Sequence, residues 1–150
     1  MADPADIHNW RRLDERLTTS GQPTEDQLAA LAEIGVRHVV NLGLHTHEKA
    51  LPDEAGSAAR LGMGYSHIPV DFQNPTPADL QAFHALMDRL QGEVVHVHCI
   101  ANYRVSAFIY RYRLDVLGWP EARARADLEA IWRPEGVWQA LVERPPRAAS

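Results

Sequence analysis

The chain has 150 residues, of which 45% are hydrophobic, and this fits one compact domain with a single core. Its formal net charge of −5 and pI near 5.9 argue against a general binder of nucleic acid or of anionic membranes, although a local basic pocket could still hold a phosphate. The single cysteine excludes an intramolecular disulfide framework. No signal segment opens the chain and no apolar run approaches about 18 residues, so we expect a cytoplasmic protein.

The chain divides into an arm, a domain and a tail. The first 16 residues are polar and carry Ile7, Trp10 and Leu13 at helical spacing, which predicts a frayed N-terminal arm or a short helix packed by Trp10. Residues 17–143 are expected to form an α/β domain. Residues 144–150 are expected to be a disordered tail.

Strands and helices alternate in the first half of the domain. Residues 17–23 predict a short strand and a turn, and the capping-box pattern Thr24-Glu-Asp-Gln27 opens an amphipathic helix. Apolar strands are predicted over residues 36–42 and 65–68, with a short helix over residues 53–61 between them. Short connections between such elements favour right-handed parallel crossovers. The expected fold is therefore a mainly parallel sheet of four or five strands with helices on both faces.

The loop over residues 43–52 contains His45 and His47, which would suggest metal ligands if they stood alone. Two histidines one residue apart need further ligands to bind a metal. The nearest candidates, His96 and His98, lie on a strand that we expect to be buried on both faces. A solvated loop without a metal is therefore the favoured interpretation.

A loop with three prolines follows over residues 69–77. Loops of this kind carry functional groups at the carboxyl ends of parallel strands. Its Asp71 is either a functional acid or a turn residue that accepts hydrogen bonds from its own backbone. Thr76 as N-cap, Pro77 at the first helical position and Asp79 at the third predict that a helix begins here.

Residues 93–106, with the sequence EVVHVHCIANYRVS, are the most informative part of the chain. A short β-branched run ends on Cys99, and a tight loop leads to a helical pattern from Val105 to Leu117. Backbone N–H groups and the helix dipole at such a loop bind an anion and favour a thiolate. Cys99 is therefore either a nucleophile beside an anion site or a small buried hydrophobe.

Further helices are predicted over residues 121–132 and 137–142, after breaks at Gly118-Trp-Pro120 and Pro134. Arg111 and Arg113, on the helix that follows the cysteine loop, are expected to face solvent. These helices complete the cover of the sheet.

The sequence His98-Cys99, a short loop, Arg104 and Ser106 resemble the His-Cys-x5-Arg-Ser/Thr phosphate loop of the protein tyrosine phosphatase superfamily, especially its small dual-specificity-like members. That family has its arginine six residues after the cysteine, where this chain has Val105. Without a gap, Ser106 matches the family's Ser/Thr; with a one-residue deletion, Arg104 matches the arginine instead. We prefer the ungapped alignment, in which the helix begins one residue after Arg104.

The resemblance implies a phosphatase that hydrolyses phosphomonoesters through a cysteinyl-phosphate, without metal or cofactor, on a phosphorylated protein or a small phosphate ester. It implies Cys99 as nucleophile, Arg104 as a charge on the phosphoryl group, Asp71 as general acid, Ser106 as a donor to the thiolate, and His98 as a brace of the loop. It also sets the loop over residues 43–52 at the mouth of the site. The remaining substrate-binding positions are those that present backbone N–H groups: Ile100, Ala101, Asn102, Tyr103 and Val105.

Two other functions stay open. The shifted arginine is compatible with a phosphate-binding pseudophosphatase, and the histidines with Cys99 are compatible with a metal or redox protein. In the phosphatase hypothesis, Arg104 leaves the loop at a different angle from the family's arginine and loses a bidentate grip, so we expect weak activity. The sequence leaves the oligomeric state and the physiological substrate open.

Overall fold

The strand order of the sheet is β1-β2-β5-β3-β4 in the computed structural model of the chain, which describes residues 2–144. Strands β2, β5, β3 and β4 run parallel to their neighbours, and β1 pairs antiparallel with β2. The prediction of a mainly parallel sheet is confirmed. The strands are β1 (Arg11–Arg12), β2 (Leu17–Ser20), β3 (His38–Asn41), β4 (Gly64–His67) and β5 (Val95–His98).

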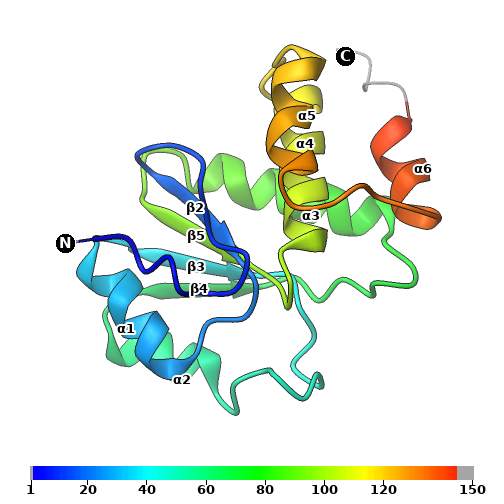
Figure 1. Cartoon of the computed structure of the whole chain (residues 1–150). Helices are drawn as coiled ribbons and strands as arrows, with labels where there is room; N and C mark the ends of the chain where they lie inside the picture. Colours follow the sequence, from blue (N-terminus) through cyan, green and yellow to red (C-terminus); the bar gives the residue numbers. More distant parts are fainter. Residues whose placement is uncertain (1, 145–150) are drawn as a thin grey trace.

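Helices cover both faces of this sheet (Figure 1). One face carries α1 (Glu25–Glu33) and α2 (Glu54–Arg60), and the other carries α3 (Pro77–Arg89), α4 (Tyr103–Asp115), α5 (Glu121–Glu129) and α6 (Val137–Glu143). No helix within residues 2–144 combines the length and apolar character needed to cross a membrane.

The core has two parts because successive strand residues point to opposite faces of the sheet. Val39 of β3 packs in one cluster with Leu28 of α1, whereas the next residue, Val40, packs in the other cluster with Phe83 of α3 and Phe108 of α4. The sheet therefore separates two hydrophobic clusters, so the helices lie on both faces as predicted but the expected single core is divided in two.

Two helices begin where the sequence predicts, through side chains that cap them locally. Thr24 Oγ1 accepts the Gln27 N–H at 3.2 Å, and Gln27 Oε1 accepts the Thr24 N–H at 2.9 Å. Thr76 and Asp79 repeat this arrangement at the start of α3, at 3.1 and 3.0 Å. Each capping box satisfies donors that the helix itself cannot satisfy.

The N-terminal arm forms turns and the short strand β1, so the alternative of a helix is wrong. Asn9 has a left-handed φ of 51°, which interrupts helical geometry, and Trp10 stacks on His96 with ring centres 5.6 Å apart. Ile7 is buried in the same cluster as α1. Of the predicted tail, residues 145–150 lie outside the described residues.

The expectation that Arg111 and Arg113 face solvent is wrong: their exposed fractions are 0% and 2%. Arg111 pairs with Asp115 at 2.5 Å, and Arg113 Nη1 lies 2.6 Å from a carboxylate oxygen of Asp127. The reason is that α5 and α6 pack onto α4 and cover the face that the sequence leaves open. Pairing with carboxylates makes such burial of charge tolerable.

Candidate active site

A cavity of about 360 Å³ opens at the carboxyl end of β5, where the chain passes from the sheet into α4. Parallel α/β sheets hold their ligands at this edge. The loops after β3, β4 and β5 line the cavity, so the fold brings Cys99, Arg104 and Asp71 together. Its lining residues are Leu44, Thr46, His47, Asp71, Phe72, Cys99, Ile100, Ala101, Tyr103 and Arg104.

The N-terminus of α4 follows Cys99 closely in the chain, after a turn at Asn102. Asn102 turns the chain into α4 with a left-handed φ of 70°, and its side chain makes no cap hydrogen bond to the helix. It donates instead to Asn9 O at 2.9 Å and to Thr19 Oγ1 at 3.1 Å. The N–H groups of the first turn of α4 have no intrahelical acceptor, so an anion at this N-terminus would meet both donors and the positive end of the dipole.

Arg104 lines the cavity from the second residue of α4. Its Nη1 donates to the Val70 carbonyl at 2.8 Å, and its guanidinium carbon lies 5.9 Å from the centre of the Phe72 ring. Its Nε is buried without a hydrogen-bond partner among the described residues. A buried guanidinium with an unused donor is suited to a phosphate oxygen.

The helix begins at Tyr103, before Arg104, so the expectation that it begins after Arg104 is wrong. Val105, which has the family's arginine position in the ungapped alignment, is 0% exposed and packs in the core. Arg104 rather than Val105 therefore lines the cavity. The geometry favours the alignment with a one-residue deletion over the ungapped one that we preferred.

Asp71 lies in a turn at the wall of the cavity. It lines the cavity with Cys99 and Arg104. Its Oδ1 also accepts the Gln73 N–H at 2.9 Å, and its carbonyl accepts the Asn74 N–H at 3.0 Å. The turn thus fixes the carboxyl group at the cavity wall.

Ser106 is not brought to the thiol. Its hydroxyl donates to the Tyr103 carbonyl at 3.0 Å and accepts from Trp132 Nε1 at 3.0 Å. The early start of α4 makes Ser106 the fourth helical residue, whose side chain faces α5 instead of the cavity. Its one hydroxyl proton is therefore directed away from Cys99, contrary to the expectation.

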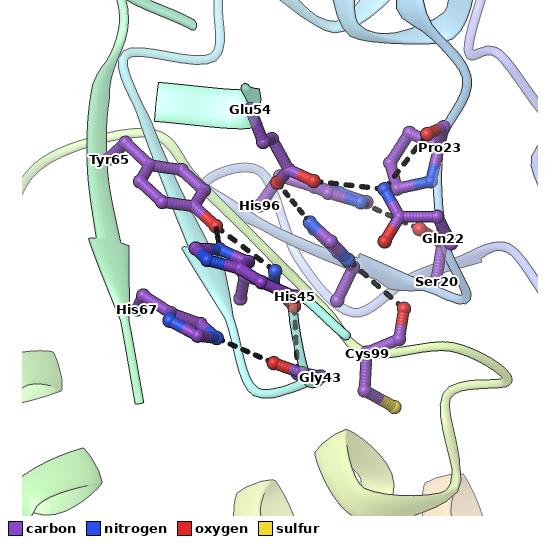
Figure 2. A network of polar contacts seen from close by, with 12 residues as sticks. Ser20, Gln22, Pro23, Gly43, His45, Glu54, Tyr65, His67, His96 and Cys99 are labelled. Carbon is purple, nitrogen blue, oxygen red and sulfur yellow. Dashed lines mark hydrogen bonds and ion pairs between the residues drawn. The ribbon is translucent and has the colours of Figure 1, made fainter. Parts of the chain in front are cut away.

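A buried chain of hydrogen bonds supports Cys99 from behind (Figure 2). His98 Nδ1 lies 3.0 Å from the Cys99 carbonyl oxygen, and His98 Nε2 lies 2.5 Å from Glu54 Oε2. Gln22 Nε2 donates to the other carboxylate oxygen of Glu54 at 2.9 Å. A carbonyl oxygen only accepts, so His98 Nδ1 carries a proton and holds the Cys99 backbone, which agrees with the bracing role that the resemblance implied.

Glu54 is the site residue that sequence reasoning missed. Burial raises the pKa of Glu54, but the hydrogen bond from His98 and the charge of that ring outweigh burial, and the net pKa lies below its usual value. Glu54 Oε2 faces His98 Nε2 while the Cys99 carbonyl faces Nδ1, so both ring nitrogens of His98 have polar partners directly behind Cys99. In sequence, Glu54 is an ordinary acid in the first turn of a helix.

His45 and His67 form hydrogen bonds with separate groups rather than with a common partner. His45 Nε2 lies 2.9 Å from the Tyr65 hydroxyl, and the His45 ring stacks on His67 with centres 3.7 Å apart (Figure 2). His67 Nε2 lies 2.6 Å from the Gly43 carbonyl. Of the loop histidines, His47 lines the cavity. Within residues 2–144 no group of three or more His, Cys, Asp or Glu side chains is arranged to hold a metal.

Known proteins resemble this chain in both sequence and fold. A "Beta-lactamase hydrolase-like protein" of Xylella fastidiosa is 36% identical over 95 residues, which cover 61% of this chain and 22% of that protein. The chain thus spans less than a quarter of that relative. A Shewanella putrefaciens protein described as "Putative phosphatase (DUF442)" is 38% identical, with a TM-score of 0.83, and the match covers 93% of this chain and 92% of that one.

The Pseudomonas aeruginosa protein TpbA, solved in complex with pTyr, shares the fold with a TM-score of 0.67 at 20% identity, covering 86% of this chain and 75% of that one. The family model described as "DSP-PTPase phosphatase fused to NAD+ Kinase" matches residues 3–131. With that match extending over most of the described residues, from the arm through α5, the chain belongs to this family of dual-specificity-type protein tyrosine phosphatase domains.

Proposed function

We propose that this chain is a cysteine-dependent phosphatase that hydrolyses phosphomonoesters through a cysteinyl-phosphate. The observation that carries the proposal is that Cys99, Arg104 and Asp71 line one cavity at the N-terminus of α4. Membership of a phosphatase family supports the reaction class. The substrate is a phosphorylated protein or a small phosphate ester, in keeping with the phosphotyrosine bound by a protein of the same fold.

In the first step, the Cys99 thiolate attacks phosphorus in line with the leaving oxygen, and an S–P bond forms as the P–O bond breaks. Backbone N–H groups from Ile100 to Val105 and the Arg104 guanidinium stabilise the equatorial oxygens. Asp71 gives its proton to the leaving oxygen. In the second step, water attacks phosphorus, Asp71 takes a proton from that water, and the S–P bond breaks to release phosphate and the thiolate.

The position of Arg104 favours an active phosphatase over the alternatives. The pseudophosphatase hypothesis and the expectation of weak activity both rested on an arginine that leaves the loop at the wrong angle, whereas Arg104 lines the cavity with an unused Nε. The metal or redox hypothesis rested on the histidines and Cys99. Among the described residues, ring nitrogens of His45, His96 and His98 lie within hydrogen-bond distance of hydroxyl, carbonyl or carboxylate oxygens. We therefore propose the phosphatase as the function that these contacts favour.

Replacement of the nucleophile tests the proposal. Cys99→Ser should abolish turnover of p-nitrophenyl phosphate, because a hydroxyl is a far weaker nucleophile than a thiolate, while inorganic phosphate should still bind through the unchanged backbone and Arg104. Steady-state kinetics and calorimetric titration with phosphate measure the two properties. Turnover that survives in Cys99→Ser would overturn the cysteinyl-phosphate mechanism.

Replacement of the acid is the second arm of the same test. Asp71→Asn should slow the hydrolysis of phenyl phosphate, whose leaving phenolate needs a proton, by about 10²–10⁴-fold, and the hydrolysis of p-nitrophenyl phosphate much less. The two substrates have nearly the same shape, so the comparison isolates the leaving group. Equal losses on both would make Asp71 a turn residue only.

A further inference from the structure

The loop over residues 69–77 is held on both sides of Asp71 by donors from distant elements. Arg104 Nη1 of α4 donates to the carbonyl of Val70, and Trp138 Nε1 of α6 donates to the carbonyl of Phe72 at 2.7 Å. Trp138 is 66 residues from Phe72 in the chain. The carbonyls of the two residues adjacent to Asp71 are therefore fixed by side chains of α4 and α6.

Trp138 is firmly placed itself. Its exposed fraction is 1%, and its ring lies 5.5 Å from Phe72 and 5.9 Å from Phe108 of α4 between ring centres. The end of α6 is tied to α4 because Arg111 Nη1 donates to the carbonyls of Val142 and Arg144, at 3.3 and 2.9 Å. Figure 1 shows α6 on the same side of the sheet as α3 and α4. Through Arg111 and Trp138, the loop is therefore linked to α4 by way of α6.

We infer that Trp138 is a positioning residue whose indole N–H sets the distance between the Asp71 carboxyl group and the leaving oxygen. The inference rests on the proposed function, because it needs Asp71 as the general acid. Asp71 is bonded to its own turn through Gln73 and Asn74, so the turn moves as one unit on its outer anchors. A displacement of about 1 Å in a catalytic group can cost about 10²-fold in rate. Trp138 itself does not line the cavity.

Trp138→Phe tests this inference, because phenylalanine keeps an aromatic ring against Phe72 and removes the N–H donor. Turnover of phenyl phosphate should fall about 10-fold, whereas turnover of p-nitrophenyl phosphate should change by less than about 3-fold. The measured quantity is the ratio of the two kcat/KM values. A merely structural role would lower both values together and leave the ratio unchanged.

Trp132→Phe is the matched control. Trp132 packs on the same Phe72 ring, with centres 5.9 Å apart, but its Nε1 donates to Ser106 in α4 instead of to the loop. The same chemical change should therefore leave the ratio of the two substrates at its wild-type value. A ratio that shifts equally in both variants would attribute the effect to aromatic packing and overturn the inference. Thermal melting checks that both variants are folded.

Asp71→Asn separates a failure of this inference from a failure of the proposed function. In the Asp71→Asn background, Trp138→Phe should no longer change the ratio, since it acts only through the acid. If Asp71→Asn discriminates the two substrates but Trp138→Phe does not, the positioning role is wrong and the proposed function stands. If Asp71→Asn itself does not discriminate them, the general acid is wrong and the inference falls with it.

Discussion

Arg104 and Val105 are neighbours in the chain, yet they have opposite surroundings. Successive residues of an α-helix point about 100° apart, so the residue at which the helix begins decides which of them faces the cavity. The left-handed backbone of Asn102 sets where the helix begins, and hydrogen bonds to Asn9 and Thr19 hold Asn102 in place. Arg104 faces the cavity, although it follows Cys99 by only five residues, because α4 begins at Tyr103 rather than after Arg104 as expected.

Exchange of the two positions should damage the enzyme. Arg104→Gly with Val105→Arg restores the usual family spacing, but it removes the cation from the cavity and forces a charge into the core. Loss of one well-placed donor to a developing oxyanion costs about 10²–10³-fold in rate, so turnover should fall at least that far below wild type. Turnover of p-nitrophenyl phosphate per folded molecule is the measurement, with folding checked by circular dichroism. A double variant that exceeds Arg104→Gly alone in turnover would restore the ungapped alignment.

The helix α4 organises the carboxyl-terminal half of the molecule. It contacts α3, α5 and α6, and it begins at the loop that follows Cys99. Arg111 joins it to α6 through buried hydrogen bonds, and α6 in turn carries Trp138. The position of the acid loop thus depends on how these helices pack, beyond the loop's own sequence.

Arg111→Ala should destabilise the protein by about 3 kcal/mol, because it removes the bidentate partner of the buried Asp115 carboxylate, to which Arg144 Nη2 also lies at 3.7 Å. Amide hydrogen exchange in α6 should accelerate as its carbonyls lose a donor. Chemical denaturation and exchange measured by mass spectrometry test both effects.

Arg125→Ala is the control for Arg111→Ala, since Arg125 also pairs with an acid four residues away. That acid, Glu121, has a half-exposed side chain, so the pair should contribute only about 0.5 kcal/mol. Similar losses of stability in the two variants would show that burial does not distinguish the pairs.

The molecule as a whole buries several of its histidines in and around the sheet. His96 has both ring nitrogens bonded to hydroxyl groups, Thr18 Oγ1 at 2.8 Å and Ser20 Oγ at 2.7 Å. Burial and the charge of His98 lower its pKa well below the usual value. Burial is also the leading cause of the lowered pKa of His38, His67 and His84. All four shifts favour the neutral form in the folded state.

Stability should therefore decrease as the pH falls below about 6.5, where histidines of the unfolded chain begin to bind protons that the folded state does not bind. His96→Gln removes one such site and should reduce the slope of unfolding free energy against pH by about 1.4 kcal/mol per pH unit between pH 6 and 5. Denaturant titrations at several pH values give the slope. Parallel curves for variant and wild type would contradict a neutral, buried His96.

Local interactions explain why much of this protein could be predicted from its sequence. The capping boxes at Thr24 and Thr76 join residues three apart, and the apolar runs at 36–42 and 93–98 form strands because β-branched residues suit a buried sheet. Cys99 at the end of a strand and before a helix already predicted an anion site. Each of these features involves neighbours in the chain, so the order of residues is sufficient to find it.

Contacts between segments far apart in the chain explain the features that the sequence did not predict. Glu54 meets His98 across 44 residues, Trp138 meets Phe72 across 66, and the turn at Asn102 depends on Asn9, 93 residues away. Arg111 looked solvent-facing because periodicity reports the polarity of a helix face, but it does not report which other helix covers that face. The cysteine loop could thus be predicted from the order of residues. The inward Arg104, the contact of Glu54 with His98 behind Cys99 and the anchors of Asp71 required the packed molecule, because their partners become neighbours only when the chain folds.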